Sequence, residues 1–288
     1  MRVLVLGVTG MLGYAVFRAF SDRSVGHEVF GTTRTQDAAA LFKPNDGGVV
    51  IPGIDVESHD SLVKAFADAR PDVVVNCIGL VKQLAEAKNP LLAVPINTLL
   101  PHRLRNLCAV VGARLVHVST DCVFSGSKGG YVESDFADAD DLYGRSKFLG
   151  EVDYPNAVTL RTSIIGHEMA GSRSLVGWFL KQREPLKGFA RAIFSGLPTV
   201  ELAHVIRDVV VPKPALRGLY HVAADPIDKY SLLCLIAKVY GKKIDIIPEY
   251  DFVIDRSLNA DRFKAATGYM APPWQTLIEQ MHRDRQGA

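Results

Sequence analysis

The chain has 288 residues, with 48% hydrophobic and 22% charged side chains, as in a globular protein of one large or two closely joined domains. A net charge of +2 gives no basic field for nucleic acid, and the four cysteines lack the spacing of metal ligands and suit a reducing compartment. No apolar run is long enough to cross a membrane and the chain starts on a strand rather than a leader, so we expect a cytoplasmic protein.

The first strand and the glycine-rich turn behind it predict a dinucleotide site. Arg2–Leu6 is short, apolar and β-branched, as in a strand buried on both faces, and a helical pattern follows the turn. In this context Gly7 would form the tight turn, Gly10 would admit backbone N–H groups to a pyrophosphate, and Gly13 would let the helix pack closely. The cofactor residues predicted here are Gly7, Thr9, Gly10, Met11, Leu12 and Gly13.

The second and third strands, Glu28–Thr33 and Gly48–Ile51, predict which dinucleotide binds. An acid at the end of the second strand would bind the ribose 2′-hydroxyl of NAD, whereas this strand ends in Thr33-Arg34, and arginine suits a 2′-phosphate. NADP(H) is therefore the preferred cofactor, with NAD(H) as the alternative. Asp55, followed by Val56, stands just past the third strand and would bond the adenine amine.

A fourth strand, Asp72–Cys77, runs into Cys77-Ile78-Gly79, where the glycine would again let the backbone approach the cofactor. Leu91–Gly112 is predicted to be a long helix that Pro95 and Pro101 kink or interrupt, and Ala113–Ser119 is the fifth strand. Strands alternating with helices at this spacing predict an α/β fold with a doubly wound parallel sheet.

Chemistry is predicted in the stretch from Ser119 to Lys147. Thr120 stands at the end of the fifth strand, and a helix over 142–151 places Tyr143 and Lys147 four residues apart on one face. A phenol beside an ammonium is a proton donor whose anion is stabilised by the neighbouring charge. Tyr143 alone among the nine tyrosines has a lysine at this spacing.

After a sixth strand at Ala157–Arg161 the composition changes. Ile165–Pro198 is irregular and rich in glycine and aromatic residues, which indicates a lobe of short elements rather than further strand–helix units. A helix at Val200–Val211 and a strand at Gly218–Val222 would rejoin the sheet. We therefore predict a dinucleotide-binding domain over 1–161, rejoined by 199–224, and a substrate-binding lobe over 162–198 and 225–288. Helices are expected in that lobe at Tyr230–Tyr240, Ala260–Thr267 and Trp274–His282.

Taken together, these motifs resemble the extended short-chain dehydrogenase/reductase superfamily, and within it the dTDP-4-dehydrorhamnose reductase branch. The likeness covers residues 1 to about 165 well and is weaker beyond, where Arg256-Ser257-Leu258 is one similar run. The motifs that carry it are Thr9-Gly10-Met11-Leu12-Gly13, Asp55-Val56, Asn76, Asn97, Ser119-Thr120-Asp121, Tyr143-x-x-x-Lys147 and Arg161-Thr162-Ser163.

The resemblance implies reduction of a nucleotide-sugar by NADPH at the sugar's C4 carbonyl. Tyr143 would supply the proton, Lys147 would hold the cofactor ribose and favour the phenolate, and Thr120 would bond the carbonyl oxygen. Asp121 would orient the sugar and Arg256 would meet the diphosphate. Ser119, Tyr143 and Lys147 complete the expected cofactor contacts. A homodimer is left open.

Two departures from that branch keep the substrate open. Asn76-Cys77-Ile78-Gly79-Leu80 replaces an alanine-rich run, and Cys122 stands where the branch often has tyrosine. These departures argue against dTDP-rhamnose as the product, and a related nucleotide-activated 6-deoxy-4-ketosugar, for example a UDP-linked and N-acetylated one, is an equal alternative as the substrate. Two other classes remain: an epimerase or dehydratase of the same superfamily, and a non-catalytic NADP-binding regulatory subunit like the β subunit of methionine adenosyltransferase.

Overall fold

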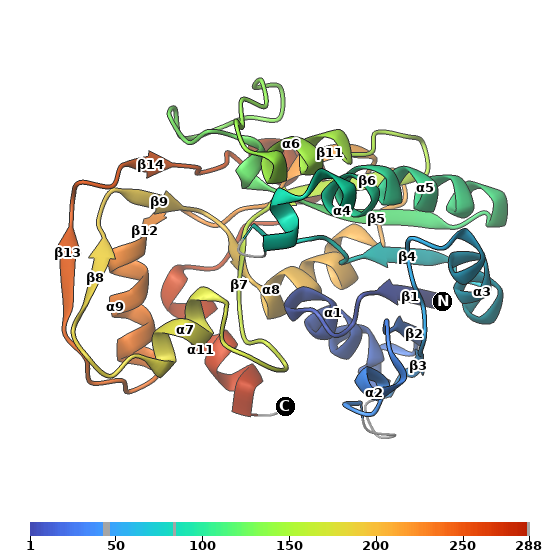
Figure 1. Ribbon diagram of the computed structural model, residues 1–288, viewed down its shortest axis with the longest axis horizontal. Coiled ribbons are helices and arrows are strands. Elements are labelled where there is room, and N and C mark those ends of the chain that lie inside the picture. The colour runs from blue at the N-terminus through green and yellow to red at the C-terminus, as the bar shows by residue number, and fades with distance from the viewer. Residues whose placement is uncertain (43–46, 83–84, 287–288) are drawn as a thin grey trace.

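A central sheet of seven strands organises the protein, in the order β11-β6-β5-β4-β1-β2-β3 with every neighbouring pair parallel (Figure 1). The computed structural model describes residues 1–42, 47–82 and 85–286. The strand order reverses between β1 and β4, the crevice at which open α/β sheets bind ligands. The predicted doubly wound sheet is therefore confirmed, with strands β1 (Arg2–Leu6), β2 (Glu28–Thr32), β3 (Val49–Ile51), β4 (Val73–Asn76), β5 (Arg114–Thr120), β6 (Ala157–Thr162) and β11 (Gly218–His221).

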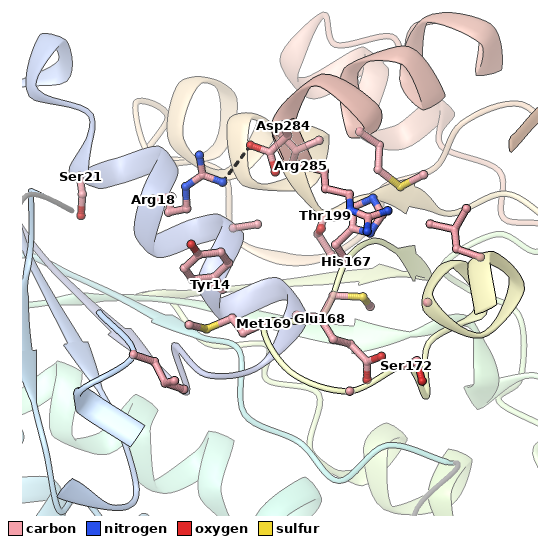
Figure 2. Close-up of a pocket in the computed structure, with 18 of the residues that line it drawn as sticks. Tyr14, Arg18, Ser21, His167, Glu168, Met169, Ser172, Thr199, Asp284 and Arg285 are labelled. Atoms are coloured by element: carbon pink, nitrogen blue, oxygen red, sulfur yellow. Dashed lines mark hydrogen bonds and ion pairs between the residues drawn. The ribbon is translucent and has the colours of Figure 1, made fainter. Parts of the chain in front are cut away.

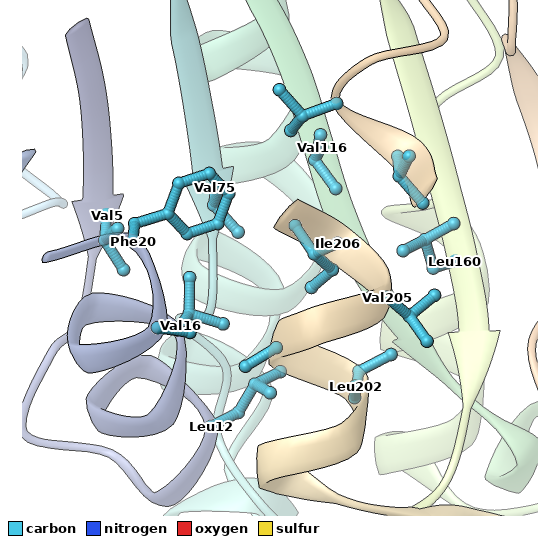
Figure 3. Packing of buried hydrophobic residues seen from close by; sticks show 14 of the residues in the cluster. Val5, Leu12, Val16, Phe20, Val75, Val116, Leu160, Leu202, Val205 and Ile206 are labelled. Atoms are coloured by element: carbon cyan, nitrogen blue, oxygen red, sulfur yellow. The ribbon is translucent and has the colours of Figure 1, made fainter. Parts of the chain in front are cut away.

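Helices cover both faces of the sheet, because successive side chains of each strand point to opposite sides. On one face, alternate residues of the strands pack against α1 (Met11–Ser21) and against α8 (Thr199–His204) with its continuation η6 (Val205–Val210) (Figure 3). The other face packs against α3 (His59–Ala69) and α5 (Leu100–Val111). The sheet is thus a buried middle layer whose strand ends alone are open to ligands.

The predicted long helix is helical throughout, and its prolines fall in or beside a π-helical turn. α4 (Pro90–Ala93) passes into the π turn η4 (Val94–Leu99) and then into α5. Inside the turn the Leu100 amide bonds to the Pro95 carbonyl five residues earlier. The wider turn keeps the helix continuous where a proline would otherwise interrupt it.

The helix that carries Tyr143 and Lys147, α6 (Leu142–Leu149), ends two residues before the predicted Glu151. It ends at Gly150, whose amide bonds back to the Lys147 carbonyl, and a Cβ at Gly150 would lie 1.9 Å from the Asn97 carbonyl oxygen. Close packing on η4 therefore admits only glycine at the residue where the helix ends. Glu151 leaves the helix and turns inward, which the sequence pattern did not predict.

Beside the sheet lies a group of short elements, here called the small lobe (Figure 1). A three-stranded sheet β12-β9-β14 and a strand pair β13-β8 pack with helices around a core that includes Phe179, Phe194 and Ile236. Within the described ranges, no helix has the length and apolar character needed to traverse a bilayer. The lobe comprises α7 (Leu175–Lys181), β8 (Leu186–Phe189), β9 (Ala192–Phe194), β12 (Ile227–Asp228), α9 (Lys229–Val239), β13 (Ile246–Glu249), β14 (Ile254–Asp255) and α11 (Trp274–Gln286).

The remaining short elements connect these layers. β11 pairs in parallel with β6, so a segment from within 199–224 is part of the central sheet. The division into two domains that the sequence suggests stays a prediction. The connecting elements are η1 (Arg23–Val25), α2 (Gln36–Ala39), η3 (Ala85–Lys88), η5 (Asp121–Val123), β7 (Ile164–Ile165), β10 (Leu197–Pro198) and α10 (Asp261–Thr267).

Candidate cofactor and active site

The turn between β1 and α1 has the geometry of a phosphate cradle. Gly7 has a φ of +81°, and a Cβ on Gly13 would lie 2.1 Å from the Gly7 carbonyl oxygen, so both positions need glycine. The Gly10 amide bonds to that same oxygen at 3.0 Å, and no side chain caps the start of α1. The backbone N–H groups at Met11 and Leu12 therefore belong to an uncapped helix N-terminus, which suits a dinucleotide pyrophosphate. Thr9 lies in the same turn.

The ends of β2 and β3 bring the predicted adenosine contacts together. The buried Thr33 accepts a hydrogen bond on its carbonyl from the Ile54 amide at 2.9 Å, which places Arg34 beside Asp55. Arg34 and Asp55 are exposed, whereas Val56 packs on the core. An exposed guanidinium and an exposed carboxylate at adjacent strand ends fit a 2′-phosphate and an adenine amine.

The end of β4 connects the glycine turn to the catalytic helix. A Cβ on Gly7 would lie 2.7 Å from Cγ1 of Ile78, so this segment abuts the turn. A Cβ on Gly79 would lie 3.6 Å from Nζ of Lys147. Cys77 is held in the same place, and burial raises the pKa of its thiol to about 12. The predicted residues Cys77, Ile78 and Gly79 thus line one continuous edge with Lys147.

Lys147 and Tyr143 project from α6 toward the end of β5. The Lys147 ammonium is buried and donates to the Val118 carbonyl at 2.9 Å. Burial lowers the pKa of Lys147 to about 8, while Glu151 and Cys77 oppose that shift. Asp141 caps the helix by accepting from the Gly144 amide at 2.7 Å. The ammonium is therefore held at the backbone of Val118, which precedes Thr120 by two residues in β5.

Thr120 meets the Tyr143 phenol at the end of β5. Burial raises the pKa of Tyr143 above its usual range, as does the neighbouring Cys122, whereas the Thr120 side chain lowers it by hydrogen bonding. The Thr120 hydroxyl also accepts from the Cys122 amide at 3.1 Å. The structure thus brings Thr120, Tyr143 and Lys147 together, and Tyr143 carries its proton at neutral pH.

Ser119 belongs to a buried ion-pair network. Its hydroxyl donates to Glu151 at 2.7 Å, and Arg161 donates to both oxygens of Glu151, at 2.9 and 2.6 Å. Arg161 also meets His221 at 2.9 Å. The Ser119 side chain is thereby committed to Glu151, and its role toward the cofactor stays a prediction.

Asp121 is buried next to two cations of the other lobe. Burial raises the pKa of Asp121, whereas Lys229 and Arg256 lower it. The family resemblance alone predicts a substrate contact for Arg256. In the structure its Nε donates to the Phe124 carbonyl at 2.8 Å. The sequence pattern does not single out Lys229, because a lysine at the start of an ordinary amphipathic helix belongs to no motif. The lobe therefore supplies two positive charges beside Thr120.

A separate pocket of about 890 Å³ lies between α1, α11 and the loop around His167 (Figure 2). It shares Met11 with the glycine turn, but Thr120, Tyr143 and Lys147 do not line it. Arg18 and Asp284 form an ion pair of 3.2 Å across it. The pocket is thus a neighbour of the candidate site rather than the place of its chemistry.

Comparison with known proteins adds two similar relatives. Methionine adenosyltransferase 2 subunit beta of Danio rerio is 28% identical over 254 residues, which are 83% of this chain and 74% of that protein. dTDP-4-dehydrorhamnose reductase of Mycobacterium tuberculosis is 39% identical over 101 residues, which are 32% of this chain and 33% of that protein.

Solved structures share the whole fold. The dTDP-4-dehydrorhamnose reductase of Bacillus anthracis in complex with NADP superimposes with a TM-score of 0.80 at 21% identity, covering 98% of this chain and 99% of that chain. The family model described as the RmlD substrate binding domain matches residues 1–286. The chain therefore belongs to the family whose model is described as the RmlD substrate binding domain, as its motifs predicted.

Proposed function

We propose that the protein is an NADPH-dependent reductase of the C4 keto group of a nucleotide-activated 6-deoxy-4-ketosugar. The observation that carries the proposal is the Tyr143 phenol beside Thr120, with Lys147 buried behind them on the same edge as the glycine turn. A protonated phenol, a second hydroxyl and an ammonium are the groups that a carbonyl reduction requires. The relatives named as reductases support the same reading.

In this mechanism bound NADPH supplies the hydride. The Thr120 hydroxyl bonds the carbonyl oxygen and holds it near the phenol, and Tyr143 gives its proton to that oxygen as negative charge develops there. Lys147 stabilises the resulting phenolate through its positive charge. Because Lys147 is fixed by the Val118 carbonyl, this charge is in place before reaction and needs no reorganisation.

The predicted residues at the glycine turn and at the ends of β2, β3 and β4 would hold the cofactor. We further propose that 1–161 with 199–224 serves as the cofactor domain, and that 162–198 with 225–288 forms the substrate lobe. Arg34 would favour NADP over NAD, since it is exposed at the end of β2. In Arg34→Ala the ratio of kcat/KM for NADPH over NADH should fall about tenfold, and an unchanged ratio would make Arg34 an ordinary surface charge.

The decisive experiment is NADPH oxidation with a panel of 4-ketosugars linked to dTDP or UDP, the UDP-linked ones with and without an N-acetyl group. Stoichiometric oxidation with one of them supports the reductase and names the sugar. An epimerase or dehydratase would convert its nucleotide sugar with no net oxidation of NADPH. The departures at Cys77 and Cys122 are the reason for including the N-acetylated, UDP-linked members.

A regulatory subunit is the second candidate, because the similarity to methionine adenosyltransferase 2 subunit beta spans 83% of this chain. That function needs no proton donor, so the Thr120, Tyr143 and Lys147 arrangement favours the enzyme. If NADP binds tightly and no ketosugar is reduced, that result supports the regulatory subunit over the reductase. Its own test is a change in the activity of a methionine adenosyltransferase catalytic subunit when this protein is added.

A further inference from the structure

The ammonium of Lys229 is unusual in having no polar partner in the part of the chain that the structure describes. It lies 3.8 Å from the centroid of the Phe194 ring, and no hydrogen-bond acceptor or carboxylate among the described residues is within bonding distance. A ring face stabilises a cation but leaves its three N–H donors unmet. The lysine also opens α9, where the positive end of the helix dipole disfavours a cation. Local energetics therefore do not account for this lysine.

Arg256 is the second cation in this place, and it is only partly satisfied. Its Nε donates to the Phe124 carbonyl at 2.8 Å, while no described residue accepts from its two terminal NH2 groups. Those groups form the planar fork that binds phosphate oxygens in pairs. The hydrogen bond from Nε therefore anchors Arg256 and leaves its two terminal NH2 groups available to a ligand.

The small sheet of the lobe places the two cations on either side of one strand. Lys229 follows β12, and Arg256 follows β14, with β9 between these two strands. Asp228 and Asp255, the residues just before the cations, both lie opposite Ile193 of β9. Two strand spacings, roughly 10 Å, therefore separate the backbones from which these long side chains extend.

Both cations act on the same dipeptide, Asp121-Cys122, next to Thr120. Asp121 is buried and feels Lys229 and Arg256, and Cys122 stays neutral because burial raises the pKa of its thiol to about 12. Lys82, the other cation near Cys122, is already paired with Asp141 at 2.5 Å. Arg256 also acts on Asp138 and Asp141, so the surrounding carboxylates match the cations in number. Among the described residues, however, none of these carboxylates accepts a hydrogen bond from Lys229 or from the terminal NH2 groups of Arg256. Such unmet donors suit the oxygens of an anion.

The family resemblance already assigns Arg256 to the diphosphate of the nucleotide-sugar. We propose that Lys229 is its partner, so that the two cations form a clamp, with Asp121 between the clamp and Thr120. The inference rests on the proposed function, in which the sugar reacts at C4 and carries the diphosphate on C1, across the ring. With Thr120 at the C4 oxygen, the next residue along the chain lies beside the ring and the clamp lies beyond it. Lys229 is thereby a substrate-binding residue that fixes which end of the sugar faces Tyr143.

The test measures nucleotide binding by calorimetry in the presence of saturating NADP⁺, so that the probes UDP and dTDP do not compete at the cofactor site. Lys229→Met keeps the length of the side chain and its packing on Phe194 but removes the charge. We expect it to weaken the affinity for the better-bound diphosphate about tenfold, and Arg256→Met to do at least as much. Lys238→Met, an exposed lysine of the same helix, is the matched control and should change nothing.

A double-variant cycle separates binding from a mere neutralisation of Asp121. If Lys229 only balances that carboxylate, its removal will have no effect in an Asp121→Asn background, and the clamp is wrong. If Lys229 binds phosphate, Lys229→Met will still lower the affinity for the diphosphate by a similar factor in the Asp121→Asn background. A wild type that prefers neither diphosphate over the matching nucleoside also overturns the clamp.

These outcomes are independent of turnover. A protein that binds a diphosphate through Lys229 and reduces no ketosugar keeps the clamp and loses the proposed reductase. A protein that reduces a ketosugar while its diphosphate affinity ignores Lys229 keeps the reductase and loses the clamp.

Discussion

Two groups of charges flank the end of β5, one buried and one half-buried, and they differ in whether their hydrogen-bonding groups have partners in the protein. In the first group, Arg161 of β6 donates two hydrogen bonds to Glu151, Ser119 donates a third to Glu151, and His221 of β11 meets Arg161. On the side of the small lobe, Lys229 lies over the ring of Phe194 and near Asp121, but it makes no hydrogen bond to any residue that the structure describes. A buried charge is expensive unless it is paired and hydrogen-bonded. The first group therefore holds the fold, and the second is arranged for something the fold does not contain.

Between these two groups lies the proposed chemistry. The satisfied pair fixes β5, β6 and the residue just after α6, which leaves Tyr143 and Lys147 in one position relative to Thr120. The unsatisfied cations belong to another segment of the chain, on the small lobe. A rigid catalytic side facing a charged binding side is the division of labour that positions a substrate for reaction.

The largest expected effect concerns the catalytic side itself. Tyr143→Phe removes the proton donor and leaves the ring's packing, so kcat should fall roughly 10²–10⁴-fold while NADP affinity and stability hold. Steady-state kinetics with the active ketosugar and calorimetry with NADP⁺ check this. Tyr220→Phe, in β11, is the control and should keep full activity. A Tyr143→Phe enzyme that turns over normally would place the donor elsewhere.

Breaking the Arg161–Glu151 ion pair should lower the free energy of unfolding and leave ligand affinity largely unchanged. Arg161→Met leaves Glu151 buried and unpaired, and we expect a loss of about 3–5 kcal/mol in the free energy of unfolding, measured in urea. Adding Glu151→Leu should restore part of it, because two apolar groups leave no uncompensated charge. A loss below about 1 kcal/mol would show that the pair is dispensable.

The pH dependence of cofactor binding sharpens the comparison between the two lysines. The pKa of Lys147 lies near 8, so its charge is present below pH 8 and is lost above it. NADPH affinity should therefore weaken above pH 8, by up to about tenfold, and Lys147→Met should bind weakly with no such dependence. The pKa of Lys229 is also about 8, but Lys229→Met should retain the wild-type pH profile for NADPH. Loss of the profile in Lys229→Met would mean that the two sites are coupled.

The smallest effect is expected for the stability of Lys229→Met. Burial lowers the pKa of Lys229 from 10.5 in the unfolded chain to about 8, so folding at pH 7 works against the charged form. The variant should be as stable as the wild type or more stable by about 1 kcal/mol at pH 7. As pH rises from 8 to 10.5 the folded protein sheds that proton first, the wild type gains stability, and the difference should vanish. A clear destabilisation at pH 7 would make Lys229 a structural residue.

Local patterns in the sequence were sufficient for much of this protein. The apolar runs of β1 and β4 predicted strands buried on both faces, and Gly7 and Gly13 predicted a turn that no Cβ can enter, because both signals depend on neighbours along the chain. The four-residue spacing of Tyr143 and Lys147 likewise predicted one shared helix face. The prediction for α6 ran two residues too far, to Glu151; the helix ends at Gly150, which packs against Asn97, a residue distant in sequence.

Only the tertiary structure decided which charged side chains lie together. Glu151 meets Arg161 ten residues later, but Lys229 reaches Asp121 across more than a hundred residues, through a small sheet whose strands are too short to be recognised by period. A lysine at a helix start looks the same whether it ends in solvent or over Phe194. Burial and the absence of a partner are properties of the surrounding fold, and they alone distinguish a surface charge from a binding group.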